Sequence, residues 1–548
     1  MAHALAGKPV QEQDIIDVQT IVDAYFDNVP DMTNPTQLVS FGTSGHRGTS
    51  VDGTFTDLHV AAITQAICDG RKQFGATGPI FVGQDTHALS QPALVTVLEV
   101  LAGNGVTAMV DCDMAFVPTP SVSRAIIRYN EEHDDKADGI IITPSHNPPD
   151  NGGIKYNTII GGPADTVVTK WIEMRANEYL TAYCESEDFK RISIDNIEPT
   201  AQVPYDYKGL YVEELGDVIN MEAIKAAGPK VLVDTLGGSG ASYWNAIKER
   251  YGLDLTIIHD DYDPTFSFMT YDHDGKVRMD CSSTYVMASV INRIRDFDLA
   301  VGNDPDYDRY GIVVSSGLIS ANTFLTLAAR YLFTTRGWKN KGVGKTVVCT
   351  TMIDKWAADA ETPVFEVPVG FKYFSQLLFD GTIGIGGEES AGASFLKKDG
   401  TVWTTDKDGM IMALLSMEIM AVMGKSALKM TDEFVEEFGN PSFGRIDAPC
   451  KKEQKQILKQ MSAELITATF VDGDPITNIR TTSLYNDMPI DGVRVETDKG
   501  WFVARPSGTE DLYKIYGESY KGDLGLVALL TAGEEIVNAA LNGTIETE

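Results

Sequence analysis

The feature that most constrains the fold of this chain is a repeated pattern of short runs rich in valine and isoleucine, each followed by a polar or glycine-rich loop. Helical patterns separate these runs, and strands that alternate with helices indicate α/β layers built on largely parallel sheets. Open sheets of this kind bind ligands beyond the carboxyl ends of their strands. We therefore expect functional residues in the loops that follow the runs 80–83, 139–142, 231–233, 299–301 and 383–385.

With 548 residues, the chain is too long for one hydrophobic core, because domains usually contain about 100–200 residues. Near the C-terminus the pattern changes to a hairpin of residues 492–496 and 501–504, followed by a final helix near 524–541. We predict three similar mixed-sheet α/β domains and a C-terminal α+β domain. Their expected bounds are 1–206, 207–323, 324–445 and 446–548.

Charge and cysteine content limit the possible partners and compartment. The 45 basic and 78 acidic residues give a net charge of −33, which argues against nucleic acid and anionic membranes as partners. The six cysteines are scattered without a Cys-x-x-Cys pair, which fits a reducing cytoplasm. The N-terminus lacks the pattern of a signal peptide, and the apolar stretch 410–423 is too short to span a bilayer. We expect a soluble, cytoplasmic protein in which 410–423 is a buried helix.

Ser145 lies directly after the strand-like run 139–142, in the turn Thr-Pro-Ser-His-Asn-Pro-Pro. The prolines on both sides stiffen the backbone and prevent a strand or helix from continuing. A stiff turn would hold the Ser145 hydroxyl at a fixed place beyond the strand end. The alternative is a serine that only caps a local backbone group. A hydrolase triad fits poorly, because His146 is the adjacent residue and no Gly-x-Ser-x-Gly motif surrounds Ser145.

Asp304, Asp306 and Asp308 alternate along a loop that follows another strand-like run. Their carboxylates would converge if the loop curls around a point, and three hard oxygen ligands with open positions suit Mg²⁺. An EF-hand is excluded, because Arg309 and Ser315 occupy the positions of its glycine and glutamate. A solvated acidic turn is the remaining alternative.

Three further loops have the composition of anion or sugar sites. Residues 505–509 combine an arginine, two hydroxyls and a glycine, which suits a phosphate group. Residues 42–48 have a similar composition, and could instead form a flexible linker. Residues 386–392 place two carboxylates and a hydroxyl between glycines, an arrangement that can accept hydrogen bonds from neighbouring sugar hydroxyls.

Taken together, these motifs resemble the α-D-phosphohexomutase family, and within it the bacterial members that act on glucose phosphates. Any one motif could arise by chance, but the ordered set is specific and covers nearly the whole chain. The motifs are GTSGHRG (42–48), TPSHNPPDNGGIKYN (143–157), NDPDYDRYG (303–311), VPVGFKYF (367–374), GGEESAG (386–392), TTDKDG (404–409) and RPSGTE (505–510).

The resemblance implies an isomerase that interconverts glucose 1-phosphate and glucose 6-phosphate. A phosphate on Ser145 would pass to the sugar, giving glucose 1,6-bisphosphate as intermediate and activator, and four domains would surround a central cleft. The resemblance further implies one Mg²⁺ per chain, held by Ser145, Asp304, Asp306 and Asp308. Lys155 and Lys407 match lysines proposed as proton donor or acceptor, and we include His146 with the catalytic residues. The catalytic set is thus Ser145, Lys155, Lys407, Arg309, Arg47 and His146, and the substrate-binding set is Glu388, Ser390, Gly370, Phe371, Arg505, Ser507, Gly508, Thr509 and Lys514.

Several alternatives stay open. A sibling enzyme could prefer mannose or glucosamine phosphates, and a Mg²⁺-dependent phosphatase could hydrolyse phospho-Ser145 with water. A non-catalytic relative could bind sugar phosphates without turning them over. His87 stands where relatives often have arginine, and we assign it no role. We expect small hexose phosphates as the partners, and a monomer or a homodimer as the assembly.

Overall fold

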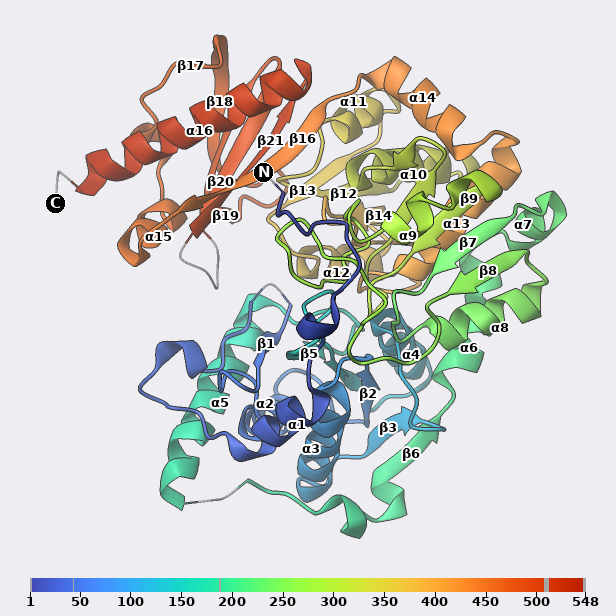
Figure 1. The fold of residues 1–548 in the computed structure, drawn as a ribbon, viewed down its shortest axis with the longest axis vertical. Coiled ribbons are helices and arrows are strands. Elements are labelled where there is room, and N and C mark those ends of the chain that lie inside the picture. Colours follow the sequence, from blue (N-terminus) through green and yellow to red (C-terminus); the bar gives the residue numbers. More distant parts are fainter. Residues whose placement is uncertain (1, 43, 187–188, 507–511, 546–548) are drawn as a thin grey trace. The chain divides into compact units, whose positions relative to one another are not determined.

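The computed structural model describes residues 2–42, 44–186, 189–506 and 512–545. Their contacts divide the chain into two compact units, which are described separately. The first unit comprises residues 1–321, 374–382 and 390–428, and the second comprises 322–373, 383–389 and 429–548. Mixed α/β layers confirm the predicted fold class (Figure 1). The central cleft and the four domain boundaries stay predictions.

The first sheet has six strands in the order β1-β5-β4-β2-β3-β6. It is mixed, because β5 runs antiparallel to β1 and β4 whereas β4, β2, β3 and β6 are parallel. The strands are β1 (His46–Thr49), β2 (Ile80–Gln84), β3 (Ala108–Asp111), β4 (Asp138–Ile142), β5 (Asn151–Asn157) and β6 (Gln202–Tyr205). The helices near it are α1 (Val18–Asp27), α2 (Asp57–Gly70), α3 (Ser90–Gly103), α4 (Thr119–Glu132) and α5 (Thr166–Ser186).

Side chains on β2 and β4 alternate between the two faces of this sheet. Ile80, Val82 and Ile140 join the hydrophobic cluster of α2, α3 and α5. Phe81 and Ile141 point the other way, into the cluster formed with α4. Successive residues of a strand face opposite sides, so fully apolar runs fit strands that are covered on both faces. Burial on both faces explains why the run before Ser145 contains no polar side chain.

The second sheet has the order β11-β10-β9-β7-β8 and is also mixed. Strands β9, β7 and β8 are parallel, and β10 is antiparallel to its neighbours β9 and β11. The strands are β7 (Val231–Asp234), β8 (Leu255–Ile258), β9 (Leu299–Gly302), β10 (Gly311–Val314) and β11 (Gly317–Leu318). The helices of this region are α6 (Tyr207–Val218), α7 (Met221–Ala227), α8 (Ala241–Tyr251) and α9 (Ala288–Ile291).

The apolar stretch near residue 410 forms α13 (Gly409–Met423), which belongs to the first unit together with β15 (Ala393–Phe395). Every residue of α13 from Gly409 to Ile419 is buried, which confirms the predicted buried helix. Glu418 lies inside this apolar helix because its carboxylate accepts a hydrogen bond from the Asn220 backbone N–H at 2.7 Å. A buried carboxylate needs such a partner.

In the second unit, β12 pairs in parallel with both β13 and β14. The carboxyl ends of these strands therefore lie along one edge, where two of the predicted sugar-binding motifs begin. The bounds are β12 (Gly342–Thr346), β13 (Val364–Val367) and β14 (Ile383–Gly387), with helices α10 (Ala321–Arg336), α11 (Met352–Asp359), α12 (Lys372–Phe379) and α14 (Ala427–Phe438). Residues 321, 374–379 and 427–428 of these helices belong to the first unit.

The last sheet is antiparallel, with the order β16-β21-β20-β19-β18-β17. The predicted hairpin is present as β19 and β20, and the final helix is α16. Strand β16 begins at Ser442, four residues before the domain boundary expected at 446. The bounds are β16 (Ser442–Pro449), α15 (Lys452–Lys459), β17 (Phe470–Val471), β18 (Asp474–Thr482), β19 (Pro489–Thr497), β20 (Gly500–Pro506), β21 (Leu512–Ser519) and α16 (Gly522–Ile545).

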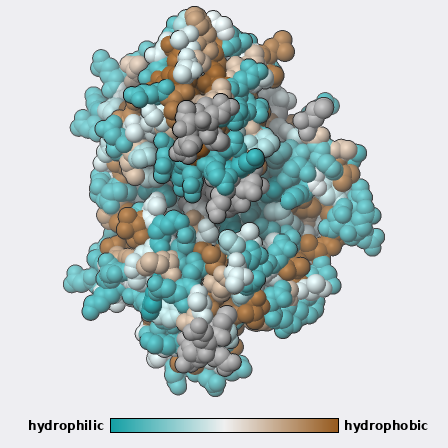
Figure 2. Space-filling model, turned by 90° about the vertical axis from the view of Figure 1, so that its left-hand side faces the viewer, coloured by the Kyte–Doolittle hydropathy of each residue, from teal (hydrophilic) through white to brown (hydrophobic). Residues whose placement is uncertain are grey.

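Within α16, the segment Gly522–Asn542 is long and apolar enough to cross a membrane by length and composition, and it alone among the single helices of the described chain meets that test. Leu529, Leu530, Val537 and Leu541 of this helix are buried in the core of the last sheet. Figure 2 shows one face of the protein, on which hydrophilic side chains predominate and hydrophobic ones form smaller groups between them.

Gly153 allows β5 to approach the turn that carries Ser145. A Cβ atom at this position would lie 2.2 Å from the Thr143 carbonyl oxygen. We expect Gly153→Ala to lower the free energy of unfolding by about 1–3 kcal/mol, because the backbone must move to relieve the overlap. Chemical denaturation followed by circular dichroism checks this.

Gly216→Ala is the matched control. Gly216 lies in α6, and no atom comes within 4 Å of a Cβ added there. Alanine should stabilise this helix by up to about 1 kcal/mol. Equal stability of the two variants would show that the β5 approach is not tight.

Candidate active site and metal centre

Ser145 follows β4 directly and is buried, with a relative exposure of 1%. Its backbone has a φ of +61°, a conformation that side chains other than glycine seldom adopt. The Ser145 N–H donates to the Thr143 hydroxyl at 2.7 Å, which ties the turn to the end of the strand. Strained backbone of this kind persists where the surroundings hold it, and functional sites are common places for it.

Asp304, Asp306 and Asp308 lie in the loop between β9 and β10, and all three are fully buried. One oxygen of each carboxylate lies within 4.8 Å of one oxygen of the others. The Ser145 hydroxyl donates to Asp304 Oδ2 at 2.8 Å, although 159 residues separate the two. The structure therefore brings the serine turn and the aspartate loop together.

Two lysines face these carboxylates. Lys155 Nζ lies on β5, 2.6 Å from Asp306 Oδ2 and 3.1 Å from Asp308 Oδ2. Lys407 Nζ lies 2.9 Å from the same Asp308 oxygen. Asp408, the N-cap of α13, directly follows Lys407, so the helix start fixes the backbone that carries this lysine. Both lysines are nearly buried, as charge-paired cations can be.

Two arginines of the predicted catalytic set lie near the three aspartates. The Arg309 backbone N–H donates to Asp304 Oδ1 at 2.9 Å, and its guanidinium pairs with Asp280 Oδ2 at 3.2 Å. Arg47 lies on β1, where its guanidinium donates to the Ser44 hydroxyl at 3.2 Å. The Asp306 and Asp308 carboxylates act on the Arg47 guanidinium electrostatically.

The three carboxylates have different electrostatic surroundings. Burial, together with repulsion from Asp306 and Asp308, raises the pKa of Asp304 well above its ordinary value. Burial opposes ionisation of Asp308 as well, but Lys155 and Lys407 outweigh it and hold the pKa of Asp308 far below its usual range. The same attraction overcomes burial at Lys155 and raises the pKa of its ammonium group. The site therefore concentrates charges of both signs in a dry environment.

The acceptor atoms of this group fit a hard divalent cation. Asp306 Oδ1 and Asp308 Oδ1 are buried, and no described residue donates a hydrogen bond to either atom. A buried carboxylate oxygen without a donor is costly, and a bound cation removes that cost. Oxygen-only ligands with room for substrate oxygens suit Mg²⁺.

His146 lies beside the serine. Its Nδ1 lies 3.2 Å from Ser145 Oγ, and its carbonyl accepts from the Met279 N–H at 3.1 Å. Burial, reinforced by the positive charge of Arg309, lowers the pKa of His146 well below its ordinary value. The imidazole is therefore neutral at physiological pH.

Sequence reasoning missed two residues of this site. Thr119 begins α4 and donates to Asp306 twice, from its hydroxyl to Oδ2 at 2.8 Å and from its N–H to the carbonyl at 2.9 Å. Asp280 holds the Arg309 guanidinium. Neither lies in a motif with recognisable spacing, and 187 residues separate Thr119 from Asp306, so only the fold reveals them.

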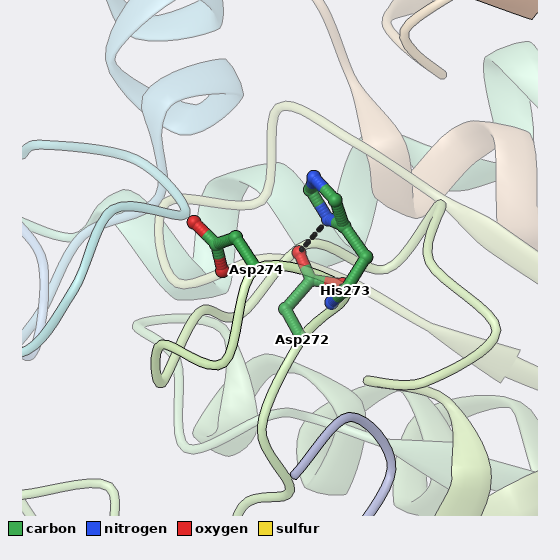
Figure 3. A group of neighbouring side chains, drawn as sticks. All are labelled: Asp272, His273 and Asp274. Atoms are coloured by element: carbon green, nitrogen blue, oxygen red, sulfur yellow. Dashed lines mark hydrogen bonds and ion pairs between the residues drawn. The ribbon is translucent and has the colours of Figure 1, made fainter. Parts of the chain in front are cut away.

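A second group of possible metal ligands, Asp272, His273 and Asp274, is shown in Figure 3. The Asp272 carboxylate pairs with His273 Nδ1 at 3.2 Å and accepts from the Ser283 hydroxyl at 2.5 Å. Asp274 pairs with Arg278 at 2.9 Å. His273 and Asp274 are exposed, and each carboxylate already has protein partners, so we assign no metal to this group.

The second unit carries most of the predicted sugar-binding residues. Glu388 is buried directly after β14, while Gly370 and Phe371 follow β13 and precede α12. Gly370 has a φ of +132°, which a residue with a Cβ would strain to adopt. Ser390 belongs to the first unit, next to Ala391, whose carbonyl accepts from the Tyr310 N–H at 3.1 Å.

Arg505 and Lys514 face each other across β20 and β21 as register partners. Arg505 Nε is buried, and none of the described residues accepts a hydrogen bond from it. A guanidinium N–H in this situation can donate to an anion. The predicted contacts Ser507, Gly508 and Thr509 lie outside the described residues.

Family comparisons cover most of the chain. Residues 38–182, 210–317 and 320–438 match the phosphoglucomutase/phosphomannomutase α/β/α domains I, II and III respectively. Residues 447–524 match the C-terminal domain of the same family. The four matches occur in the order that the sequence motifs predicted.

Individual relatives agree with these matches. The chain is 47% identical over 539 residues to a phosphoglucomutase of Komagataeibacter xylinus, covering 97% of both chains. It is 26% identical to phosphoglucomutase 1 of Saccharomyces cerevisiae, covering 88% of both. A crystal structure of a putative phosphomannomutase from Thermus thermophilus has the same fold, with a TM-score of 0.71 at 23% identity, covering 91% of this chain and 99% of that one.

Asp408 should make stability depend on pH. Its carboxylate accepts from Tyr211 OH at 2.8 Å and from Trp403 Nε1 at 2.8 Å, and burial raises its pKa to about 6. The folded state thus favours the protonated form. The resulting stabilisation is present below about pH 4 and is lost as the pH rises through 6, a change of about 3 kcal/mol.

Asp408→Asn removes this titration and keeps a helix-capping side chain. The free energy of unfolding of the variant, relative to the natural protein, should therefore increase between pH 4 and pH 7. Urea denaturation at several pH values measures the difference. Parallel curves for the two proteins would contradict the expectation.

Proposed function

The chain belongs to the phosphoglucomutase/phosphomannomutase family, and we propose that it interconverts glucose 1-phosphate and glucose 6-phosphate with Ser145 as the phosphoryl carrier. One observation carries the proposal. The Ser145 hydroxyl donates to Asp304 at 2.8 Å, within a buried group of three carboxylates and two lysines. The identity of 47% to a bacterial phosphoglucomutase favours glucose over mannose or glucosamine.

The reaction transfers one phosphoryl group in each direction. Phospho-Ser145 gives its phosphoryl group to the free hydroxyl of the hexose monophosphate, which breaks the bond from phosphorus to Ser145 Oγ and forms glucose 1,6-bisphosphate. The other phosphate of this intermediate then returns to Ser145, and the isomeric monophosphate leaves. The proton lost by the attacking sugar hydroxyl in the first step balances the proton taken up when Ser145 Oγ is released.

Asp304, Asp306, Asp308 and Ser145 would hold the Mg²⁺ ion. Bound there, the ion would act as a Lewis acid that withdraws charge from the phosphoryl oxygens. The unpartnered oxygens of Asp306 and Asp308 support this assignment. The identity of the cation and the role of the bisphosphate as activator are part of the proposal.

The chain's own cations complete the electrostatic stabilisation. Phospho-Ser145 and the substrate each bring a charged phosphate, and catalysis of phosphoryl transfer depends on positioning and on charge stabilisation. We assign this role to Lys155, Lys407, Arg309 and Arg47. Lys155 is held as an ammonium by Asp306 and Asp308, so in this arrangement it contributes a positive charge.

We assign the remaining predicted residues to the substrate. Glu388 and Ser390 would accept hydrogen bonds from two sugar hydroxyls, and Gly370 and Phe371 would contact the sugar. Arg505, Lys514 and the loop residues Ser507, Gly508 and Thr509 would hold the phosphate that does not react. The unpartnered Arg505 Nε supports this assignment. Binding energy at that phosphate orients the sugar for transfer.

Small hexose phosphates are the partners that this reaction requires. The net charge of −33 supports the prediction that the protein binds neither nucleic acid nor anionic membranes. A cytoplasmic location and a monomeric or homodimeric state are likewise proposed, from the composition and from the family.

Ser145→Ala should abolish the interconversion, because it removes the oxygen that carries the phosphate. Incubation with glucose 1,6-bisphosphate should add the mass of one phosphate to the natural protein and none to the variant. A coupled assay for glucose 6-phosphate measures turnover. The control is Ser462→Ala, at an exposed residue that precedes the short 3-10 helix Ala463–Leu465 of the second unit. Turnover near the natural rate in the Ser145 variant would eliminate the mechanism.

Arg505→Ala should raise KM for glucose 1-phosphate by about tenfold to a hundredfold, because a charge-assisted contact contributes about 1.5–3 kcal/mol. Arg445→Ala is a matched control in the same sheet, since Arg445 pairs with Asp447 at 3.2 Å. Steady-state kinetics on glucose, mannose and glucosamine phosphates measure both KM and specificity. An unchanged KM for the Arg505 variant would show that the loop is misassigned.

A further inference from the structure

A buried pair of a carboxylate and an imidazole lies beside the serine turn. Asp85 and His87 follow β2 with relative exposures of 0% and 1%. His87 Nδ1 lies 2.8 Å from Asp85 Oδ2, and His87 Nε2 lies 3.0 Å from the carbonyl oxygen of Asn147. The imidazole thus bridges the loop after β2 and the turn that contains Ser145.

The same carboxylate reaches Ser145 by a second route. Thr143 donates its hydroxyl hydrogen to Asp85 Oδ2 at 2.6 Å and accepts the Ser145 N–H at 2.7 Å. Ser90 donates to the other Asp85 oxygen at 2.5 Å. Asp85 therefore anchors the Ser145 turn on both sides of the serine, through Thr143 before it and through His87 and Asn147 after it.

The geometry determines how many protons the pair holds. A backbone carbonyl only accepts hydrogen bonds, so His87 Nε2 donates to Asn147. An ionised carboxylate likewise only accepts, so Nδ1 donates to Asp85. Both contacts are attractive only when the pair carries the additional proton, as an imidazolium beside a carboxylate. Loss of that proton places a lone pair against an acceptor in one of the two contacts.

We propose that His87 is a positioning residue for phosphoryl transfer, and that its bridge between Asp85 and the Asn147 carbonyl holds the turn that aims the Ser145 hydroxyl. The inference rests on the proposed role of Ser145 as the phosphoryl carrier. A positive φ at Ser145 needs external support, and the Asp85 network supplies it. The side chain of His87 contacts Asp85 and the Asn147 carbonyl, so it acts on Ser145 through the turn.

The groups around His87 support its charged form. Burial opposes the charge, but the Asp85 carboxylate outweighs burial and leaves the pKa of His87 above its ordinary value. Asp306 adds a weaker attraction in the same direction. The Phe266 ring packs beside the imidazole at 5.1 Å between centroids, and the Asp85 carboxylate also acts electrostatically on the Tyr262 hydroxyl.

His87→Gln tests the proposal, because glutamine is neutral and places an oxygen toward one of the two acceptors. We expect the rate of phosphoryl transfer from glucose 1,6-bisphosphate to Ser145 to fall by about tenfold to a hundredfold, because a small misplacement of a reacting group can slow a reaction by that much. KM for glucose 1-phosphate should stay within about twofold, because Arg505 is untouched. Intact mass spectrometry over time and steady-state kinetics measure the two effects.

His87→Arg is the rescuing variant, since a guanidinium keeps donors and charge at every pH. In the natural protein, kcat should decline as the pH rises past the raised pKa of His87. The arginine variant should lack that decline. An identical pH profile for the two proteins would overturn the proposal.

His259→Gln is the matched control. His259 Nδ1 pairs with Asp234 Oδ1 at 2.8 Å, and Asp234 ends β7 much as Asp85 follows β2, but this pair lies outside the serine turn. The control should keep the natural transfer rate.

Thr143→Val provides a second test in case His87→Gln folds poorly. Valine has a similar shape but lacks the hydroxyl that links Asp85 to the Ser145 N–H. We expect the same loss of transfer rate, with Thr143→Ser restoring it. Transfer at the natural rate in a folded His87→Gln or Thr143→Val variant would refute the positioning role.

The outcomes separate this inference from the function itself. If the natural protein gains one phosphate and Ser145→Ala does not, the carrier is established whatever His87 does. If the Ser145→Ala variant turns over substrate at the natural rate, Ser145 is not the phosphoryl carrier. The positioning role of His87, which depends on that carrier, is then refuted as well.

Discussion

The hydrogen bond from Ser145 to Asp304 is the interaction on which the site depends, because it joins two loops from different sheets. Three buried carboxylates would repel one another without compensation, and Lys155 and Lys407 supply that compensation at 2.6–3.1 Å. Charges held in a dry site act more strongly than the same charges in water. In the proposed reaction, a phosphoryl group would meet cations already in place, so its transfer would need little reorganisation of the site.

Much of the fold follows from sequence patterns. The apolar runs before Ser145 and before Asp304 are strands β4 and β9, and the stretch after Asp408 is the buried helix α13. These elements were predictable because their signals are local: continuous apolar runs followed by polar loops, and prolines that stop a strand. The hairpin of β19 and β20 was predictable for the same reason.

The residues that sequence reasoning missed act through contacts distant along the chain. Thr119 meets Asp306 across 187 residues, and His87 meets the Asn147 carbonyl across 60. Local sequence patterns do not predict contacts of this kind. His87 received no role from its position in the sequence, and its importance appears only when both ring nitrogens are seen to face acceptors. Tertiary packing also assigns residues 390–428 to the first unit, although the sequence groups them with the residues around them.

The left-handed backbone at Ser145 limits which amino acid could serve there as the proposed phosphoryl carrier. Threonine offers an equivalent nucleophilic oxygen, but its branched Cβ is poorly tolerated at a positive φ. Cysteine would fit the backbone but would present sulfur to a hard cation that prefers oxygen. The shape of the main chain therefore excludes one candidate nucleophile and the preference of the cation excludes another, which leaves serine as the residue compatible with both.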